Sequence, residues 1–213
     1  MALTRLNTNA YGSTINLATN TTGTLGVANG GTGLASGTSG QFLKFTGSTT
    51  VASAAVDPGI TQYDEWLVTS SFTDDADPIS SNWARNAANT FSYIGDGMSE
   101  SSGVFTFPET GIYKVEFFGR CAQASTGERD IAAYIQKTVN NSSYDEASAT
   151  ESSIYKNGGS WFQSFYQAAT IDVTSTGLRK VRFKIAVNQS STETQCSGTL
   201  SSTGAKFTRL GDT

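Results

Sequence analysis

The sequence contains no histidine, and this absence removes several kinds of chemistry. Histidine is the usual general base near neutral pH and the commonest metal ligand, so a Ser-His-Asp or Cys-His site cannot form. Basic residues are also few: 14 Lys and Arg stand against 18 Asp and Glu, and they form no block. A net charge of -4 without a basic patch argues against a nucleic-acid partner.

Long apolar stretches are missing as well. Nothing approaches the roughly 18 consecutive apolar residues of a membrane span. The first residues, MALTRLNTNAYG, also lack the apolar run of a signal peptide. We therefore expect a soluble protein that is not exported by the usual route and has no membrane partner.

Motifs of other catalytic chemistries are absent too. GTGLAS, from Gly31, departs from the dinucleotide-binding fingerprint because Ser36 stands where the last glycine belongs. Neither a GxxxxGK[ST] loop nor a GxSxG nucleophile elbow occurs, and no pair of carboxylates is singled out for glycoside hydrolysis. We predict that the protein is not an enzyme and holds no cofactor.

Two groups of residues could carry metal or redox chemistry. Cys121 and Cys196 lie far apart and show no CxxC spacing; two free, buried thiols are favoured, with a disulfide as the alternative. Asp74, Asp75 and Asp77 in TDDADP offer oxygen ligands of the kind calcium prefers, but they lack the spacing and bidentate glutamate of an EF-hand loop. A solvated acidic loop is favoured over a metal site.

The residues that are present divide the chain near residue 60. Before it the charges are limited to Arg5, Lys44 and Asp57, and Thr, Ser, Asn, Gly and Ala dominate. After it come all three tryptophans and ten of the twelve phenylalanines, in a stretch long enough to bury a core. We predict a stem of residues 1–60 and a folded head of residues 61–213.

Short apolar pairs in the stem alternate with small polar residues and stop at glycine. Leu25 and Val27 precede Gly30, Gly31 and Gly33, and such a pattern predicts short strands and tight turns. The side chains are too small for a core within one chain. Three copies wound together could share a narrow apolar stripe, with glycine where backbones approach closely. A disordered linker is the alternative.

The phrase ATNTTGTLGVANGGTGLASGTSGQFLKFTGSTT resembles a glycine-punctuated segment of many bacteriophage tail-fibre and virion structural proteins. In those proteins a TGTL.VANGGTG phrase precedes an SGQ.L...GST phrase, and the resemblance extends over about residues 14–56. It implies that the stem attaches the protein to another virion protein. The candidate attachment residues are Leu25, Val27, Gly30, Gly31 and Gly33.

Alternation of apolar and polar residues runs through the head. KVRFKIAV places Val181, Phe183 and Ile185 on one face, and GVFTFPETGIYKVEFFGR alternates on both sides of a turn at Pro108. DIAAYIQKTV, SWFQSFYQAATIDV and AKFTRLG continue the pattern. Loops such as NNSSYDEASATESS and NQSSTETQCSG are expected between them. Many strands with hairpin-length and longer loops predict an all-β sandwich.

The order of these features resembles the globular head of the complement C-one-q and tumour-necrosis-factor superfamily, over about residues 83–211. In FSYIGDGMSESSGVFTFPETGIYKVEFF, Gly103 opens a strand, Pro108 marks a corner and Gly111 begins the next strand. TSTGLRKVRFKIAV and KFTRLGD match a later turn and the closing strand. The resemblance implies a ten-strand jelly roll that forms a trimer around its inner sheets. The candidate residues of the threefold contact are Tyr113, Phe117, Phe183 and Phe207.

Aromatic residues near the expected loops are a further candidate feature. Those that could stack on sugars are Tyr144, Tyr155, Trp161 and Tyr166. For Trp161, Phe162 and Phe165 a place in the core or an interface is favoured.

Stem and head together favour a virion structural protein of a tailed phage, assembled in the bacterial host cytoplasm. The expected form is a homotrimeric short fibre or decoration spike, on the tail or the head of the virion. It would attach by its stem and display its head, with a host surface glycan as candidate partner. A lectin-like adhesin and, less favoured, a polysaccharide-cleaving enzyme are the alternatives.

Overall fold

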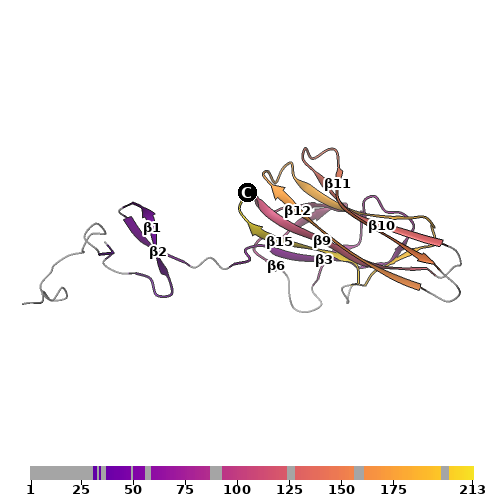
Figure 1. Ribbon diagram of the computed structural model, residues 1–213, viewed down its shortest axis with the longest axis horizontal. Coiled ribbons are helices and arrows are strands. Elements are labelled where there is room, and N and C mark those ends of the chain that lie inside the picture. The colour runs from indigo at the N-terminus through magenta and orange to yellow at the C-terminus, as the bar shows by residue number, and fades with distance from the viewer. Residues whose placement is uncertain are drawn as a thin grey trace, which may run out of the picture. The chain divides into compact units, whose positions relative to one another are not determined.

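The computed structural model describes residues 31, 32, 34, 37–48, 50–55, 59–86, 93–123, 128–155, 161–197 and 202–213. Leu25, Val27, Gly30 and Gly33 lie outside these residues, and Gly31 lies in a bend. The chain divides into two compact units, Met1–Pro58 and Gly59–Thr213 (Figure 1). The described part of the chain contains no helix long and apolar enough to cross a membrane.

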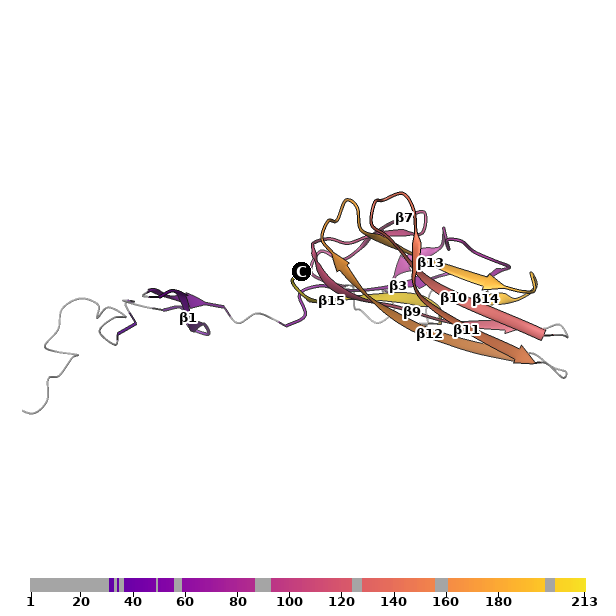
Figure 2. The ribbon, with the colours of Figure 1, turned by 45° about the horizontal axis from the view of Figure 1, so that its top comes forward.

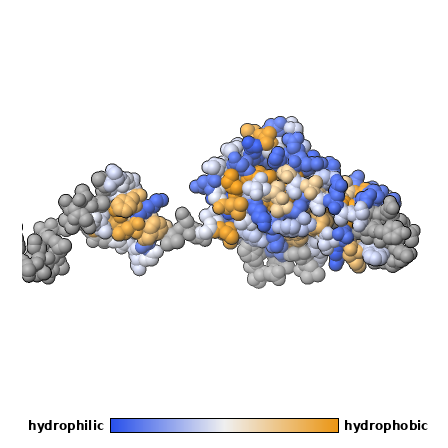
Figure 3. All heavy atoms as spheres, in the orientation of Figure 1, coloured by the Kyte–Doolittle hydropathy of each residue, from blue (hydrophilic) through white to orange (hydrophobic). Residues whose placement is uncertain are grey.

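The first unit contains a β-hairpin. β1 (Phe42–Gly47) pairs antiparallel with β2 (Thr50–Ala54). Because side chains alternate across a strand, Leu43, Phe45 and Val51 share one face of the hairpin and Phe42 lies on the other. Phe42 is 46% exposed and Phe45 is 70% exposed. Figure 3 shows apolar side chains gathered on the visible side of this hairpin, and among the described residues no second layer covers Phe45.

The second unit is a sandwich of two antiparallel sheets. The five-stranded sheet has the order β11-β10-β13-β8-β7. Its strands are β7 (Ser99–Ser101), β8 (Val104–Thr106), β10 (Glu128–Thr138), β11 (Asp145–Tyr155) and β13 (Lys180–Val187). All-β structure, as the alternation predicts, is confirmed throughout the described residues.

The eight-stranded sheet has the order β4-β14-β9-β15-β3-β5, with β12 paired to β9 and β6 paired to β3. Its strands are β3 (Tyr63–Val68), β4 (Phe72–Thr73), β5 (Trp83–Arg85), β6 (Tyr93–Ile94), β9 (Gly111–Gln123), β12 (Trp161–Val173), β14 (Glu193–Gln195) and β15 (Gly204–Gly211). β11 and β12 follow each other in the chain and lie side by side at the edges of the two sheets (Figure 2). The chain thus crosses between the sheets at this edge.

The core between the sheets is rich in aromatic rings. Phe105 on β8 contacts Trp66, Trp83, Phe183 and Phe207, with ring centroids 5.0 to 5.5 Å apart. These pairs are edge-on or tilted, an arrangement that adds to the gain from apolar burial. The residues come from both sheets, so the core joins the two layers.

A buried carboxylate connects the turn before β7 to β3. Asp64 accepts hydrogen bonds from Trp66 Nε1 at 2.8 Å, from Arg85 Nε at 3.2 Å and from the Met98 amide at 2.7 Å. The Arg85 guanidinium lies 4.9 Å from the Trp66 ring and 4.4 Å from the Tyr93 ring. Both charges therefore have partners, as buried charges require.

Two segments expected as loops contain strands. In NNSSYDEASATESS, residues from Asp145 onward form β11, which pairs with β10 along its whole length. In NQSSTETQCSG, β14 pairs with β9 and β4. β11 is an edge strand with few apolar residues, and the ladder with β10 satisfies its backbone. Such a strand lacks the alternation on which the prediction rests.

Candidate functional site

The outer face of the eight-stranded sheet carries exposed aromatic side chains. Phe162 and Tyr166 on β12 point away from the core and are 56% and 58% exposed. Phe118 on β9 pairs directly with Tyr166. Arg120 lies over the Phe162 ring at 5.1 Å, and Lys206 Nζ lies 5.3 Å from the Phe118 ring. We call Phe118, Phe162 and Tyr166 the aromatic face; aromatic residues and arginine are typical of protein interfaces.

Charged side chains continue this surface along β9. Glu116 accepts hydrogen bonds from Lys114 Nζ, at 2.9 Å, and from the Tyr166 hydroxyl. Burial by itself raises the pKa of Glu116, but these hydrogen bonds and the charges of Lys114 and Lys206 outweigh it, so that the pKa is lowered. Glu116 is therefore ionised at neutral pH and holds Tyr166 in one orientation.

The four residues expected at the threefold contact lie instead in the core of a single chain. Tyr113, Phe117, Phe183 and Phe207 are at most 1% exposed. Phe117, for example, packs against Phe183 with ring centroids 4.8 Å apart. A side chain without exposed surface cannot contact a second copy. On β9 the residues available for such a contact are those of the opposite face, including Phe118.

The aromatic residues considered for sugar stacking lie in different parts of the head. Tyr144 is half-buried and its ring lies 4.2 Å from the Arg182 guanidinium of β13. Trp161 and Tyr166 lie on β12 and are exposed. The side chain of Tyr155 lies outside the described residues. The described candidates therefore form no single stacking platform.

Phe162 and Phe165 are three residues apart on β12 and face opposite sides of the sheet. Phe165 is buried, and its ring lies against Gly119 of the paired strand β9. Phe162 is exposed on the aromatic face. The expectation for these residues is a place in the core or in an interface. Phe165 lies in the core, and Phe162 is exposed and available for contact with another chain.

The acidic loop TDDADP is held by separate partners. Asp77 forms ion pairs with Arg182 at 3.2 Å and Lys184 at 3.1 Å. Asp75 accepts a hydrogen bond from the backbone amide at the end of β13, at 2.7 Å, and Asp74 accepts one from the Asp75 amide, at 2.9 Å. Within the described ranges no group of three or more His, Cys, Asp or Glu side chains is placed to hold a metal ion.

Both cysteines are free, with Cys121 buried and Cys196 half-buried. The Cys121 Sγ lies 3.6 Å from the Thr194 hydroxyl. Burial raises the pKa of Cys121 to about 11 and that of Cys196 to about 12. Both thiols are therefore protonated at neutral pH, and a thiol in this state is a poor nucleophile.

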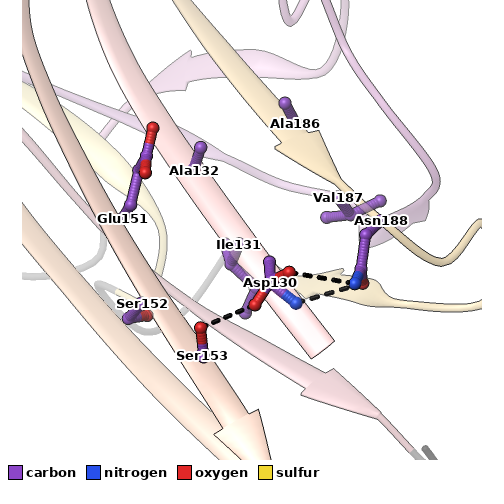
Figure 4. Close-up of a pocket in the computed structure, with 9 residues that line it drawn as sticks. All are labelled: Asp130, Ile131, Ala132, Glu151, Ser152, Ser153, Ala186, Val187 and Asn188. Carbon is purple, nitrogen blue, oxygen red and sulfur yellow. Dashed lines mark hydrogen bonds between the residues drawn. The ribbon is translucent and has the colours of Figure 1, made fainter. Parts of the chain in front are cut away.

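A pocket of about 510 Å³ lies on the outer face of the five-stranded sheet (Figure 4). Its lining comes from β10, β11 and the end of β13. The side chains that shape it are Asp130, Ala132, Glu151, Ser153, Ala186 and Asn188. Sequence reasoning misses this pocket because Glu151 and Ser153 belong to the segment expected as a loop. Only the pairing of β11 with β10 brings them beside Asp130.

Similarity of this chain to known proteins is found at the level of the fold. No protein-family model matches the chain, and no curated protein matches it. The structure of Eiger TNF from S. frugiperda is similar, with a TM-score of 0.54 and 11% identity, and the match covers 71% of this chain and 93% of that chain. A crystal structure of murine APRIL at pH 5.0 has a TM-score of 0.50 and 13% identity, covering 70% of this chain and 98% of that one.

This protein therefore has a tumour-necrosis-factor-like jelly-roll fold, and the jelly-roll prediction is confirmed. The described residues of the second unit form thirteen strands rather than ten, in sheets of five and eight. Several of these strands, including β4, β6 and β14, are only two or three residues long.

Proposed function

We propose that the protein is a homotrimeric structural protein of a phage virion, a short fibre or decoration spike. Its first unit attaches to another virion protein, and its jelly-roll head faces outward. The protein acts without catalysis and reaches the virion after assembly in the bacterial cytoplasm. The virion role is supported by the resemblance of residues 14–56 to phage structural proteins.

The observation that carries self-assembly is the aromatic face. Phe162 and Tyr166 are more than half exposed on the edge strand β12, beside Phe118 of β9. Contact with another copy would remove this apolar area from water and is favourable by about 25 cal/mol per Å² before the costs of association. Three copies are proposed because the sequence resembles a superfamily with trimeric heads.

The hairpin of the first unit supports assembly independently. A two-stranded hairpin alone is marginally stable in water, and this one exposes apolar side chains on both faces. Contact with the same segment of other copies, or with a virion protein, would cover Phe42 on one face and Phe45 on the other.

Light scattering on the purified full chain tests the assembly. We expect a mass three times the chain mass of 22.4 kDa. The double variant Phe162→Ser, Tyr166→Ser is expected to give the monomer mass with the head still folded. The matched control is Leu178→Ser, because Leu178 is about half exposed in a turn away from the aromatic face.

Two results would contradict this part of the proposal. A monomeric wild-type chain would contradict the proposed trimer. An unchanged trimer in the double variant would show that the contact between copies lies on another surface. The virion role needs a separate test, immunoelectron microscopy of phage particles with antibodies against the head. Unlabelled particles would argue against it.

A further inference from the structure

The pocket on the five-stranded sheet contains one row of hydrogen-bonded side chains, contributed by β11, β10 and the residue that follows β13. Ser153 and Asp130 are directly opposite each other on β11 and β10, and Asn188 follows β13. Asp130 accepts hydrogen bonds from Ser153 Oγ at 2.6 Å and from Asn188 Nδ2 at 3.1 Å, and its amide donates to Asn188 Oδ1 at 3.0 Å (Figure 4). The Asp130 carboxylate is thus held in one orientation.

This carboxylate has hydrogen-bonding capacity left over. Each oxygen of an ionised carboxylate can accept about two hydrogen bonds. One bond to each oxygen of Asp130 is supplied by the protein, and the residue is exposed. A fixed group with free acceptor positions binds a ligand without first losing its own rotamer freedom.

A second row beside the first contains two alanines and a glutamate. Glu151, Ala132 and Ala186 are opposite one another on β11, β10 and β13. The two methyl groups form a low floor between taller neighbours, and Glu151 borders it with a second carboxylate (Figure 4). The volume of about 510 Å³ lies in the range typical of small-molecule sites.

An aromatic residue continues the same face of β10. Side chains two residues apart on a strand share a face, so Tyr134 follows Asp130 and Ala132. Its ring lies 5.1 Å from Lys184 Nζ, a contact that fixes the ring beside the small row. Carboxylates, a small apolar floor and an aromatic ring therefore follow one another along the sheet.

The chemistry of these groups defines a ligand class. The carboxylates of Asp130 and Glu151 repel an anion and accept hydrogen bonds, so the ligand must donate hydrogen bonds and carry no negative charge. It must also present one apolar face to the alanine floor. We propose that the pocket binds a pyranose ring of a neutral or amino sugar. As the ligand of a displayed head this rests on the proposed function, but binding itself needs only one chain.

Saturation-transfer NMR on the full chain tests this inference. The probes are glucose, galactose, N-acetylglucosamine and glucosamine, with N-acetylneuraminic acid as the anionic probe. We expect transfer to at least one of the first four and none to the anionic sugar. Glu151→Gln and Ala132→Leu should each weaken binding about tenfold, by removing an acceptor and by filling the floor. Glu146→Gln, an exposed residue of the same strand, is the matched control.

Three outcomes would overturn the inference. They are the absence of transfer to all four sugars, binding that both pocket variants leave unchanged, and tight binding of calcium alone with sugar binding abolished by a chelator. Light scattering on the same samples tests the assembly separately from sugar binding. A trimer without sugar binding overturns only the proposal of a sugar site, and a monomer that binds sugar overturns only the proposal of a trimer.

Discussion

Phenylalanine side chains have opposite surroundings in the two units of the chain. Phe105 and Phe183 in the second unit are fully buried, whereas Phe42 and Phe45 in the hairpin are largely exposed. All four belong to antiparallel strands with alternating side chains. The difference is the second sheet, which covers the inward face of each strand in the sandwich. Apolar residues in a strand therefore stabilise a chain only where a second layer covers them.

The largest expected effect comes from emptying the core. Phe183→Ala should lower the free energy of unfolding of the head by about 3 to 5 kcal/mol, because it removes a ring packed against several others. Phe45→Ala in the hairpin should leave the free energy of unfolding of the head unchanged. Urea unfolding followed by tryptophan fluorescence reports on the head, since all three tryptophans lie there. Equal losses in the two variants would refute the contrast between the units.

A smaller effect is expected from adding one methyl group. A Cβ on Gly119 would lie 2.2 Å from Phe165 Cζ, whereas one on Gly37 in the first unit would meet only Ser53 Oγ at 4.0 Å. Gly119→Ala should therefore cost about 1 to 3 kcal/mol through overpacking. Gly37→Ala should leave the stability of the head unchanged. A Gly119→Ala head as stable as the wild type would show that Phe165 moves aside freely.

The smallest effect is expected at alkaline pH. Burial raises the pKa of Tyr113 from 10.0 to about 12. The unfolded chain releases this proton first, so the stabilisation is complete below about pH 10 and is lost as the pH rises toward 12. Tyr113→Phe should reduce the loss of stability over this interval. Urea unfolding at several pH values and one protein concentration measures this loss of stability. If the free energy of unfolding falls equally steeply with pH in the variant, Tyr113 is not the cause.

Strands with strict alternation were predictable from the sequence. In β13, Val181, Phe183 and Ile185 are buried and Arg182 and Lys184 face outward, as the pattern KVRFKIAV indicates. β11 has no such pattern, because an edge strand of Ser, Thr and Glu takes its stability from hydrogen bonds to β10. Because β10 is a separate segment of the chain, the residues of β11 alone do not reveal this pairing.

The candidate site was less predictable for a related reason. Alternation shows that Tyr113 and Phe117 share a face, but it does not say whether their own second sheet or another copy covers that face. The sandwich uses it for the core, which leaves Phe118 and its neighbours for contacts. The pocket likewise depends on register across β11, β10 and β13, which is a property of three segments together.

The position of β15 has a consequence for synthesis in the cell. This strand is the last of the sheet to leave the ribosome, yet it lies between β3 and β9 and pairs with both. Until residues 204–211 have been made, these two strands expose unpaired backbone edges, and such edges invite pairing with other chains. The head therefore cannot complete its eight-stranded sheet before β15 is made, and neighbouring nascent chains on one messenger RNA would meet while those edges are open.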